Sequence, residues 1–138
     1  GKDDSLYPKD LQKRAIVDQR LHYSNDVFYI LKQAARELFY HNKNTLPADI
    51  LGKIREVQEN VEKLLAGQEF IAGGFLTVAD YSYVTLIDVI ETLSPSENKC
   101  PLTQAWYQRC KSGMKDFDKV NANGASRLIT AIKEQMAS

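Results

Sequence analysis

The residues with the widest scope for chemistry form a polar and aromatic stripe in segment 8–41, which has no internal glycine or proline. The stripe consists of Tyr29, Lys32, Gln33, Arg36 and Tyr40. Tyr29, Gln33, Arg36 and Tyr40 follow one another at steps of four, three and four residues, which places them on one face of a helix, with Lys32 beside them. Aromatic and polar groups at the edge of a core are typical of a ligand cleft. The alternative is a solvated face whose long side chains cover the edge of the core, and the residue types alone favour that interpretation.

No other spacing in the chain predicts a reactive centre. His22 and His41 have no partner at the spacing of helical metal ligands. Cys100 and Cys110 have neither metal-ligand nor redox spacing, which is typical of reduced, inert thiols in a cytosolic protein. A nucleophile elbow and a phosphate-binding glycine loop are also absent from the sequence. We therefore expect no metal site and no catalytic residue in this chain.

Asp80 is an acidic residue in an otherwise apolar segment, and its spacing to Thr77 predicts a structural role. The two residues have the spacing of a capping box. In that motif the Thr77 hydroxyl accepts a hydrogen bond from the Asp80 backbone N–H, and the Asp80 carboxylate accepts from the Thr77 N–H. The negative charge also suits the first turn of a helix. We therefore expect Thr77 and Asp80 to begin a helix and not to perform catalysis.

Composition and charge exclude several classes of protein. The chain has 138 residues, of which 43% are hydrophobic and 26% are charged, as in one ordinary globular domain. Eighteen basic residues balance eighteen acidic ones, so nucleic acid and anionic membranes are poor candidate partners. No segment has the length and hydropathy of a membrane span, and none resembles a signal peptide. These features predict a cytoplasmic protein.

Apolar periodicity predicts an all-α fold of about five helices around a buried central helix. Helices are expected over 8–41, 47–66, 77–93, from 101 past 110, and around 128–136. The segment 77–93 is apolar on most sides, so it is the expected central helix. The predicted core stripe of the first helix is Val17, Leu21, Ser24, Phe28, Leu31, Ala35 and Leu38.

Residues 70–82 resemble the F-x-A-G-x-x-x-T-x-A-D-x-S segment of cytosolic glutathione transferases. Segments 5–10 and 17–23 are similar to the linker end and first helix of the insect delta and epsilon classes. Segments 101–109 and 121–124 fit the last helices of the same family. Because the motifs occur in the family's order along the whole chain, the sequence is identified as a C-terminal helical domain of this kind.

The resemblance implies a division of labour between two domains. It makes residues 1–7 a remnant of the interdomain linker and residues 8–138 the all-α C-terminal domain, with the N-terminal thioredoxin-like domain absent from this chain. In these classes the N-terminal domain binds glutathione and carries a serine that stabilises the thiolate. The intact protein is then expected to conjugate glutathione to hydrophobic electrophiles in xenobiotic detoxification, as a homodimer, whereas this chain alone is expected to be inactive.

The resemblance also implies which side chains line the site of the hydrophobic co-substrate. They are Tyr29, Lys32, Gln33, Arg36 and Tyr40 on the first helix, and Leu128, Ala131 and Ile132 on the last. Several of these positions are usually aromatic, apolar or arginine in the family, so Lys32, Gln33 and Arg36 imply a wetter, more cationic pocket. We hypothesise a preference for substrates with a carboxylate or sulfonate, which Arg36 can hold through two hydrogen bonds. The alternative is that Lys32 and Arg36 point into solvent and leave selectivity unexplained.

Two functions of other classes compete with the enzyme. Domains of this family also occur as non-catalytic interaction modules, including in a translation elongation factor subunit. A ligand carrier that sequesters apolar compounds without turnover is the other possibility. The motifs typical of the delta and epsilon classes at both ends of the chain favour the enzyme over the interaction module.

Overall fold

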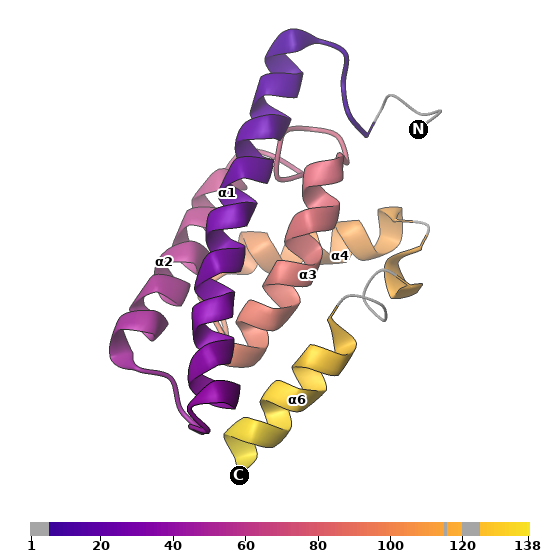
Figure 1. Cartoon of the computed structure of the whole chain (residues 1–138). Coiled ribbons are helices and arrows are strands. Elements are labelled where there is room, and N and C mark those ends of the chain that lie inside the picture. The colour runs from indigo at the N-terminus through magenta and orange to yellow at the C-terminus, as the bar shows by residue number, and fades with distance from the viewer. Residues whose placement is uncertain (1–5, 115, 120–124) are drawn as a thin grey trace.

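The computed structural model of the chain describes residues 6–114, 116–119 and 125–138. This part is built from helices, as the sequence predicts (Figure 1). The elements are α1 (Leu11–Ala35), a π-helical turn η1 (Arg36–Tyr40), α2 (Ala48–Leu64), α3 (Val78–Leu93), α4 (Pro101–Gly113) and α6 (Ser126–Ala137). Within these residues the β-structure amounts to an isolated bridge between Phe70 and Gly73. The all-α fold class is confirmed. Segment 121–124 and most of the predicted linker remnant lie outside the described residues.

Helix α3 is the central helix, which confirms the prediction for this segment. It packs most extensively on α1 and also contacts α4 and α6 (Figure 1). Its buried side chains point in several directions around the helix axis: Ala79, Asp80, Tyr83, Val84, Leu86, Ile87, Val89, Ile90 and Leu93. The Tyr83 hydroxyl donates a 2.7 Å hydrogen bond to the backbone oxygen of Arg20 in α1. Because each fully buried aliphatic or aromatic side chain contributes about 1.5–3 kcal/mol, this all-round burial makes α3 the centre of the core.

The start of α3 contains the predicted capping box and a further set of contacts. The Asp80 carboxylate accepts from the Thr77 N–H at 2.8 Å, and the Thr77 hydroxyl accepts from the Ala79 N–H at 3.3 Å. The second Asp80 oxygen accepts from the Ile71 N–H at 2.9 Å and from the Trp106 indole N–H at 2.8 Å. Burial raises the Asp80 pKa, while these hydrogen bonds act in the opposite direction. The carboxylate therefore joins α3 both to the preceding loop and to α4.

The core stripe of α1 differs from the prediction by one residue at two positions. Val27 and Ala34 are buried, whereas Phe28 is 56% exposed and Ala35 is only partly buried. Neighbouring positions on a helix lie about 100° apart, and apolar residues occupy both of the possible registers here. The prediction was wrong at these two positions because the three- and four-residue steps that it followed fit Phe28 and Ala35 as well as Val27 and Ala34. The Lys32 ammonium lies 6.0 Å from the centre of that exposed ring.

The first helix is also shorter than predicted, and it ends in a wider turn. The Asp10 carboxylate caps its start by accepting from the Lys13 N–H at 3.0 Å. At the other end the His41 N–H donates to the Arg36 carbonyl at 3.0 Å, a bond that spans five residues. Such a π turn takes in an extra residue, so the side chains after it are rotated about the axis compared with an α-helix.

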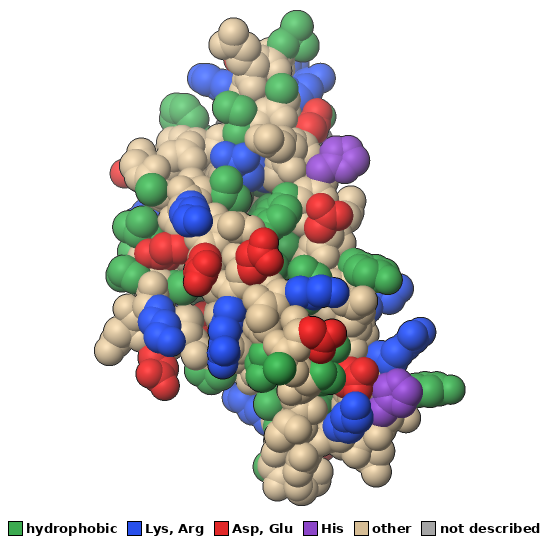
Figure 2. Space-filling view, turned by 90° about the vertical axis from the view of Figure 1, so that its left-hand side faces the viewer, with side chains coloured by type: hydrophobic (Ala, Val, Ile, Leu, Met, Phe, Trp, Pro, Cys, Tyr) green, Lys and Arg blue, Asp and Glu red, His purple; other side chains and the backbone are tan. Residues whose placement is uncertain are grey.

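Charges of both signs are mixed over the side of the molecule on which α2 lies. Figure 2 shows basic and acidic side chains interspersed on that face, in agreement with the balanced composition. Exposed residues of α2 include Arg55, Glu56, Glu59 and Lys63. No large field of one sign covers this face, so local pairing determines where a charged ligand can bind.

Candidate functional site

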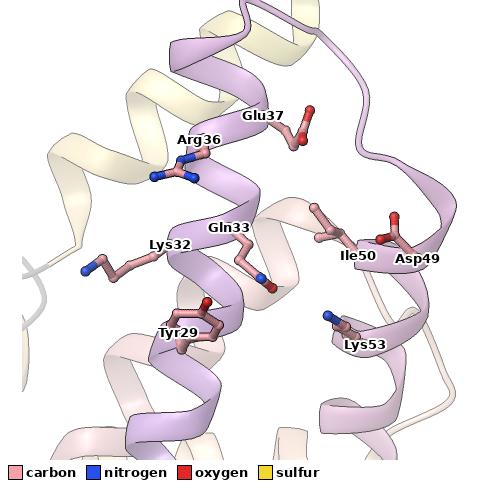
Figure 3. A pocket seen from close by; sticks show the side chains of 8 residues that line it. All are labelled: Tyr29, Lys32, Gln33, Arg36, Glu37, Asp49, Ile50 and Lys53. Atoms are coloured by element: carbon pink, nitrogen blue, oxygen red, sulfur yellow. The ribbon is translucent and has the colours of Figure 1, made fainter.

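The predicted stripe borders a hollow between α1 and α2. The hollow has a volume of about 410 Å³. It is lined by Tyr29, Lys32, Gln33, Arg36 and Glu37 from α1 and η1, and by Asp49, Ile50 and Lys53 from α2 (Figure 3). The structure therefore brings together four of the five stripe residues, all except Tyr40.

The lining side chains point in two directions. Gln33 extends toward α2, in the direction of Ile50 and Lys53, whereas Lys32 and Arg36 extend from α1 away from α2 (Figure 3). The Gln33 side-chain oxygen is buried and accepts no hydrogen bond from the described part of the chain. A buried acceptor of this kind is stabilised by a donor, so the inner part of the hollow suits an N–H or O–H group.

The cations of the stripe have few acidic partners. Lys32 and Arg36 are exposed and stand four residues apart, so they share a face of the helix. Neither forms an ion pair with a residue among 6–114, 116–119 and 125–138. The neighbouring Glu37 carboxylate is paired instead with the Lys43 ammonium at 2.8 Å. The outer rim of the site therefore carries two exposed positive side chains, Lys32 and Arg36, that form no ion pair with the described residues.

The remaining predicted site residues lie outside the hollow. Tyr40 is 82% exposed and packs edge-to-face on His41, with the ring centres 5.2 Å apart. In α6, Leu128 is exposed, Ala131 is partly buried and Ile132 is a core residue with 1% exposure. The burial of Ile132 leaves little of its side chain for a ligand to contact in this arrangement.

Helix α6 is held against the end of the first helix by polar contacts. It packs on η1 and α3 (Figure 1). The Gln135 side-chain amide donates to the Lys43 backbone oxygen at 2.8 Å and to the Asn42 side chain at 3.2 Å. These contacts place α6 next to the turn that follows Arg36, so residues of both helices adjoin one region of the surface.

The contribution of α2 to the hollow was not predicted. Asp49 and Lys53 are separated by four residues, so they share a face of α2 that lies opposite Gln33 and Glu37 (Figure 3). Their charges and spacing were readable in the sequence. The sequence does not indicate that this face of α2 packs beside the polar stripe of α1.

Other kinds of chemistry find little support among the described residues. No cluster of three or more His, Cys, Asp or Glu side chains in this part of the chain has the arrangement of a metal site. Cys100 and Cys110 are buried free thiols, and burial raises the pKa of both. None of the described helices is long and apolar enough to cross a bilayer. The arrangement around the hollow is suited to binding and orienting a ligand.

Comparisons with known proteins agree on one family. Residues 20–112 match the model of the glutathione S-transferase C-terminal domain. The chain is 36% identical to glutathione S-transferase 1 of Manduca sexta over 130 residues, which are 90% of this chain and 58% of the relative. A solved epsilon-class glutathione S-transferase from the housefly, Musca domestica, has a TM-score of 0.89 at 33% identity, with 98% of this chain and 63% of the other covered.

A further solved structure adds a ligand to this comparison. It is a glutathione transferase homolog from Drosophila mojavensis with bound glutathione, with a TM-score of 0.88 at 33% identity. The match covers 98% of this chain and 62% of that protein. This chain therefore spans about three fifths of the length of the relatives that it matches.

Proposed function

The chain belongs to the family of glutathione S-transferase C-terminal domains, and we propose that it supplies the co-substrate-binding half of a glutathione transferase. The observation that carries the proposal is the match of this family over residues 20–112, together with insect relatives named as glutathione S-transferases. The length of those relatives that this chain does not cover is proposed to hold the thioredoxin-like, glutathione-binding domain. Residues 1–7 are then the linker between the two parts.

The proposed reaction is the conjugation of glutathione to a hydrophobic electrophile. The glutathione thiolate, activated by the N-terminal domain, forms a bond to the electrophilic carbon while the leaving group departs with its electron pair. This chain contributes the wall that holds and orients the electrophile. Holding the reacting atoms in place lowers the entropic part of the barrier and does not require a reactive group from the wall.

The proposed wall combines the stripe of the first helix with residues of the last. It consists of Tyr29, Lys32, Gln33, Arg36, Tyr40, Leu128 and Ala131, with Ile132 adjacent to them in the core. The contact of α6 with η1 supports this assignment, because it brings the two sets of residues to neighbouring parts of the surface. In the intact protein the second wall comes from the glutathione-binding domain, and the preferred assembly is a cytoplasmic homodimer that acts in detoxification.

The test compares this chain alone with a fusion of it to the part of the Drosophila mojavensis relative that it does not cover. The assay is the conjugation of glutathione to 1-chloro-2,4-dinitrobenzene. We expect no conjugation above the uncatalysed rate from the chain alone and clear turnover from the fusion. Turnover by the chain alone would contradict the proposed division of labour. A folded fusion that retains glutathione and electrophile but does not join them would favour the carrier instead.

A further inference from the structure

Residues 6–8, which precede the first helix, are bonded to two different parts of the fold. The Leu6 carbonyl accepts a hydrogen bond from the Val78 N–H at 2.8 Å. Val78 is the first residue of α3, and the capping box bonds the N–H groups of its neighbours Thr77 and Ala79 but not its own. The Leu6 carbonyl therefore satisfies a donor that has no partner within the helix. Figure 1 shows the segment passing beside the start of α3 on its way to α1.

The rest of the segment is fixed to α1 by two side chains of that helix. The Tyr7 hydroxyl donates to the Asp18 carboxylate at 2.9 Å, and the Arg14 guanidinium lies over the Tyr7 ring, 4.5 Å from its centre. The Arg14 Nε–H also donates to the Pro8 backbone oxygen at 2.9 Å. Arg14 therefore holds two consecutive residues of the segment at once.

The backbone of this segment has little conformational freedom of its own. The proline ring fixes the φ angle of Pro8, and it restricts the preceding residue, Tyr7, to extended conformations. The segment leads into α1, whose first turn is capped by the Asp10 carboxylate. Each of residues 6–8 therefore has a contact with α1 or with the start of α3. A flexible tether would instead let the parts that it joins take many relative orientations.

From these contacts we infer that residues 6–8 form a rigid strap, fixed by Tyr7 and Arg14, that sets the orientation of the preceding domain relative to the helices. The inference rests on the proposed function, in which that domain binds glutathione. The strap lies at the start of α1, whereas the hollow borders the later part of that helix. Tyr7 and Arg14 therefore act on the reaction only through the relative position of the two domains, and they are positioning residues.

The relative position of the domains matters because the proposed reaction joins a group bound on one domain to a group bound on the other. A thiolate and an electrophilic carbon react readily only when they are held about 3–3.5 Å apart and in the right direction. If the strap is loosened, each substrate still binds to its own domain, but the two reach the productive orientation less often. The kcat should then fall, while the KM for glutathione stays the same.

The first test measures by amide hydrogen exchange whether the strap is fixed in this chain. Tyr7→Ala removes both contacts of the Tyr7 side chain, so the Val78 N–H should exchange about tenfold faster in this variant than in the wild type. The Thr77 N–H, which is bonded to Asp80, is the internal reference. Its exchange rate should stay within about twofold, because a loss of global stability would raise both rates. An unchanged rate at Val78, or an equal rise at Thr77, would overturn the inference.

The second test measures the kinetics of strap variants in the fusion. Arg14→Gln removes the bond to Pro8 and the contact with Tyr7, so it should lower kcat about three- to thirtyfold and leave the KM for glutathione within twofold. Tyr7→Phe keeps the ring over Arg14 and should recover most of the activity that Tyr7→Ala loses. Arg109→Gln is the matched control, because the Arg109 Nε–H also donates to a backbone oxygen, that of Glu69 at 2.8 Å, away from the strap. It should leave kcat unchanged.

Small-angle X-ray scattering of the fusion gives a readout that does not depend on activity. Arg14→Gln should raise the radius of gyration above that of the wild type, whereas Arg109→Gln should not. An inactive fusion that shows this difference would contradict the proposed function and support the strap. An active fusion in which Arg14→Gln leaves kcat unchanged, or in which Arg109→Gln lowers it equally, would overturn the strap and support the proposed function. An unchanged radius of gyration in Arg14→Gln would overturn the strap whether or not the fusion is active.

Discussion

Replacing Asp80 with alanine tests whether its carboxylate does more than cap a helix. The substitution removes the acceptor of three donors, which are the backbone N–H groups of Ile71 and Thr77 and the indole N–H of Trp106. Leaving a buried donor unsatisfied costs about 1–3 kcal/mol. Part of the cost of leaving these three donors unsatisfied is offset, because the raised Asp80 pKa indicates that burying the carboxylate charge is itself unfavourable. We expect a net loss of about 3–5 kcal/mol in the free energy of unfolding.

The assay is urea denaturation at neutral pH, with Thr77→Ala as the matched variant. Thr77→Ala removes the hydroxyl that accepts from the Ala79 N–H and should cost about 0.5–2 kcal/mol, as for an ordinary cap. A whole domain is stable by only about 5–15 kcal/mol, so Asp80→Ala should also lower the Tm by roughly 10–20 °C.

An Asp80→Ala variant no less stable than Thr77→Ala would refute the argument, because the carboxylate would then act only as a cap. If Asp80→Ala does not fold, Trp106→Phe provides a second test of the same argument. It removes one donor to the carboxylate and leaves the other two hydrogen bonds in place. We expect it to cost about 1–3 kcal/mol, and a cost near zero would equally refute the argument.

Three further predictions concern other parts of the fold. Glu62→Gln should lower the free energy of unfolding by about 1–2 kcal/mol in urea, because the Glu62 carboxylate caps α4 through the Thr103 N–H and hydroxyl, each at 2.9 Å; an unchanged midpoint would contradict this. Burial raises the pKa of Asp88 above its ordinary 3.8, so the folded state holds that proton more tightly than the unfolded state. The stabilising contribution of Asp88 is then present below pH 3.8 and is lost as the pH rises through the pKa of Asp88 in the folded state. Over this pH range the free energy of unfolding of the wild type should fall relative to that of Asp88→Asn. A rise would contradict the assigned direction. Cys100 and Cys110 are buried with raised pKa values, so iodoacetamide at pH 8 should label both in urea and neither in the folded chain, as mass spectrometry can show. Rapid labelling of the folded chain would show that the thiols are accessible.

The parts of the fold that depend on nearby residues could be predicted from the sequence. The start of α3 follows from two residues three positions apart, and its burial follows from apolar residues on most of its sides. The contact of Asp80 with Trp106 spans 26 residues, so no local pattern indicates it. In α1 the local pattern allowed two registers, and the packing of the helix in the fold buries Val27 and leaves Phe28 exposed.

The candidate site could likewise be predicted from the sequence only in part. The spacing of Tyr29, Lys32, Gln33 and Arg36 was sufficient to place them on one face, and the structure brings them to one hollow. Tyr40 does not line the hollow, and it is the last residue of a π turn for which the sequence carries no clear signal. The residues of α2 that complete the hollow depend on how two helices pack. The role of all these residues in binding a substrate stays a prediction.

The kinetics of Tyr29→Ala in the fusion test most directly whether this chain forms the electrophile wall of a glutathione transferase. Tyr29 is exposed and lines the hollow, so its loss should not disturb the core. Phe75→Ala is the control, because Phe75 is a similarly exposed ring that does not line this hollow. We predict that Tyr29→Ala raises the KM for 1-chloro-2,4-dinitrobenzene severalfold and leaves the KM for glutathione unchanged, while Phe75→Ala changes neither. Equal changes in both KM values, or no change in either, would contradict the account.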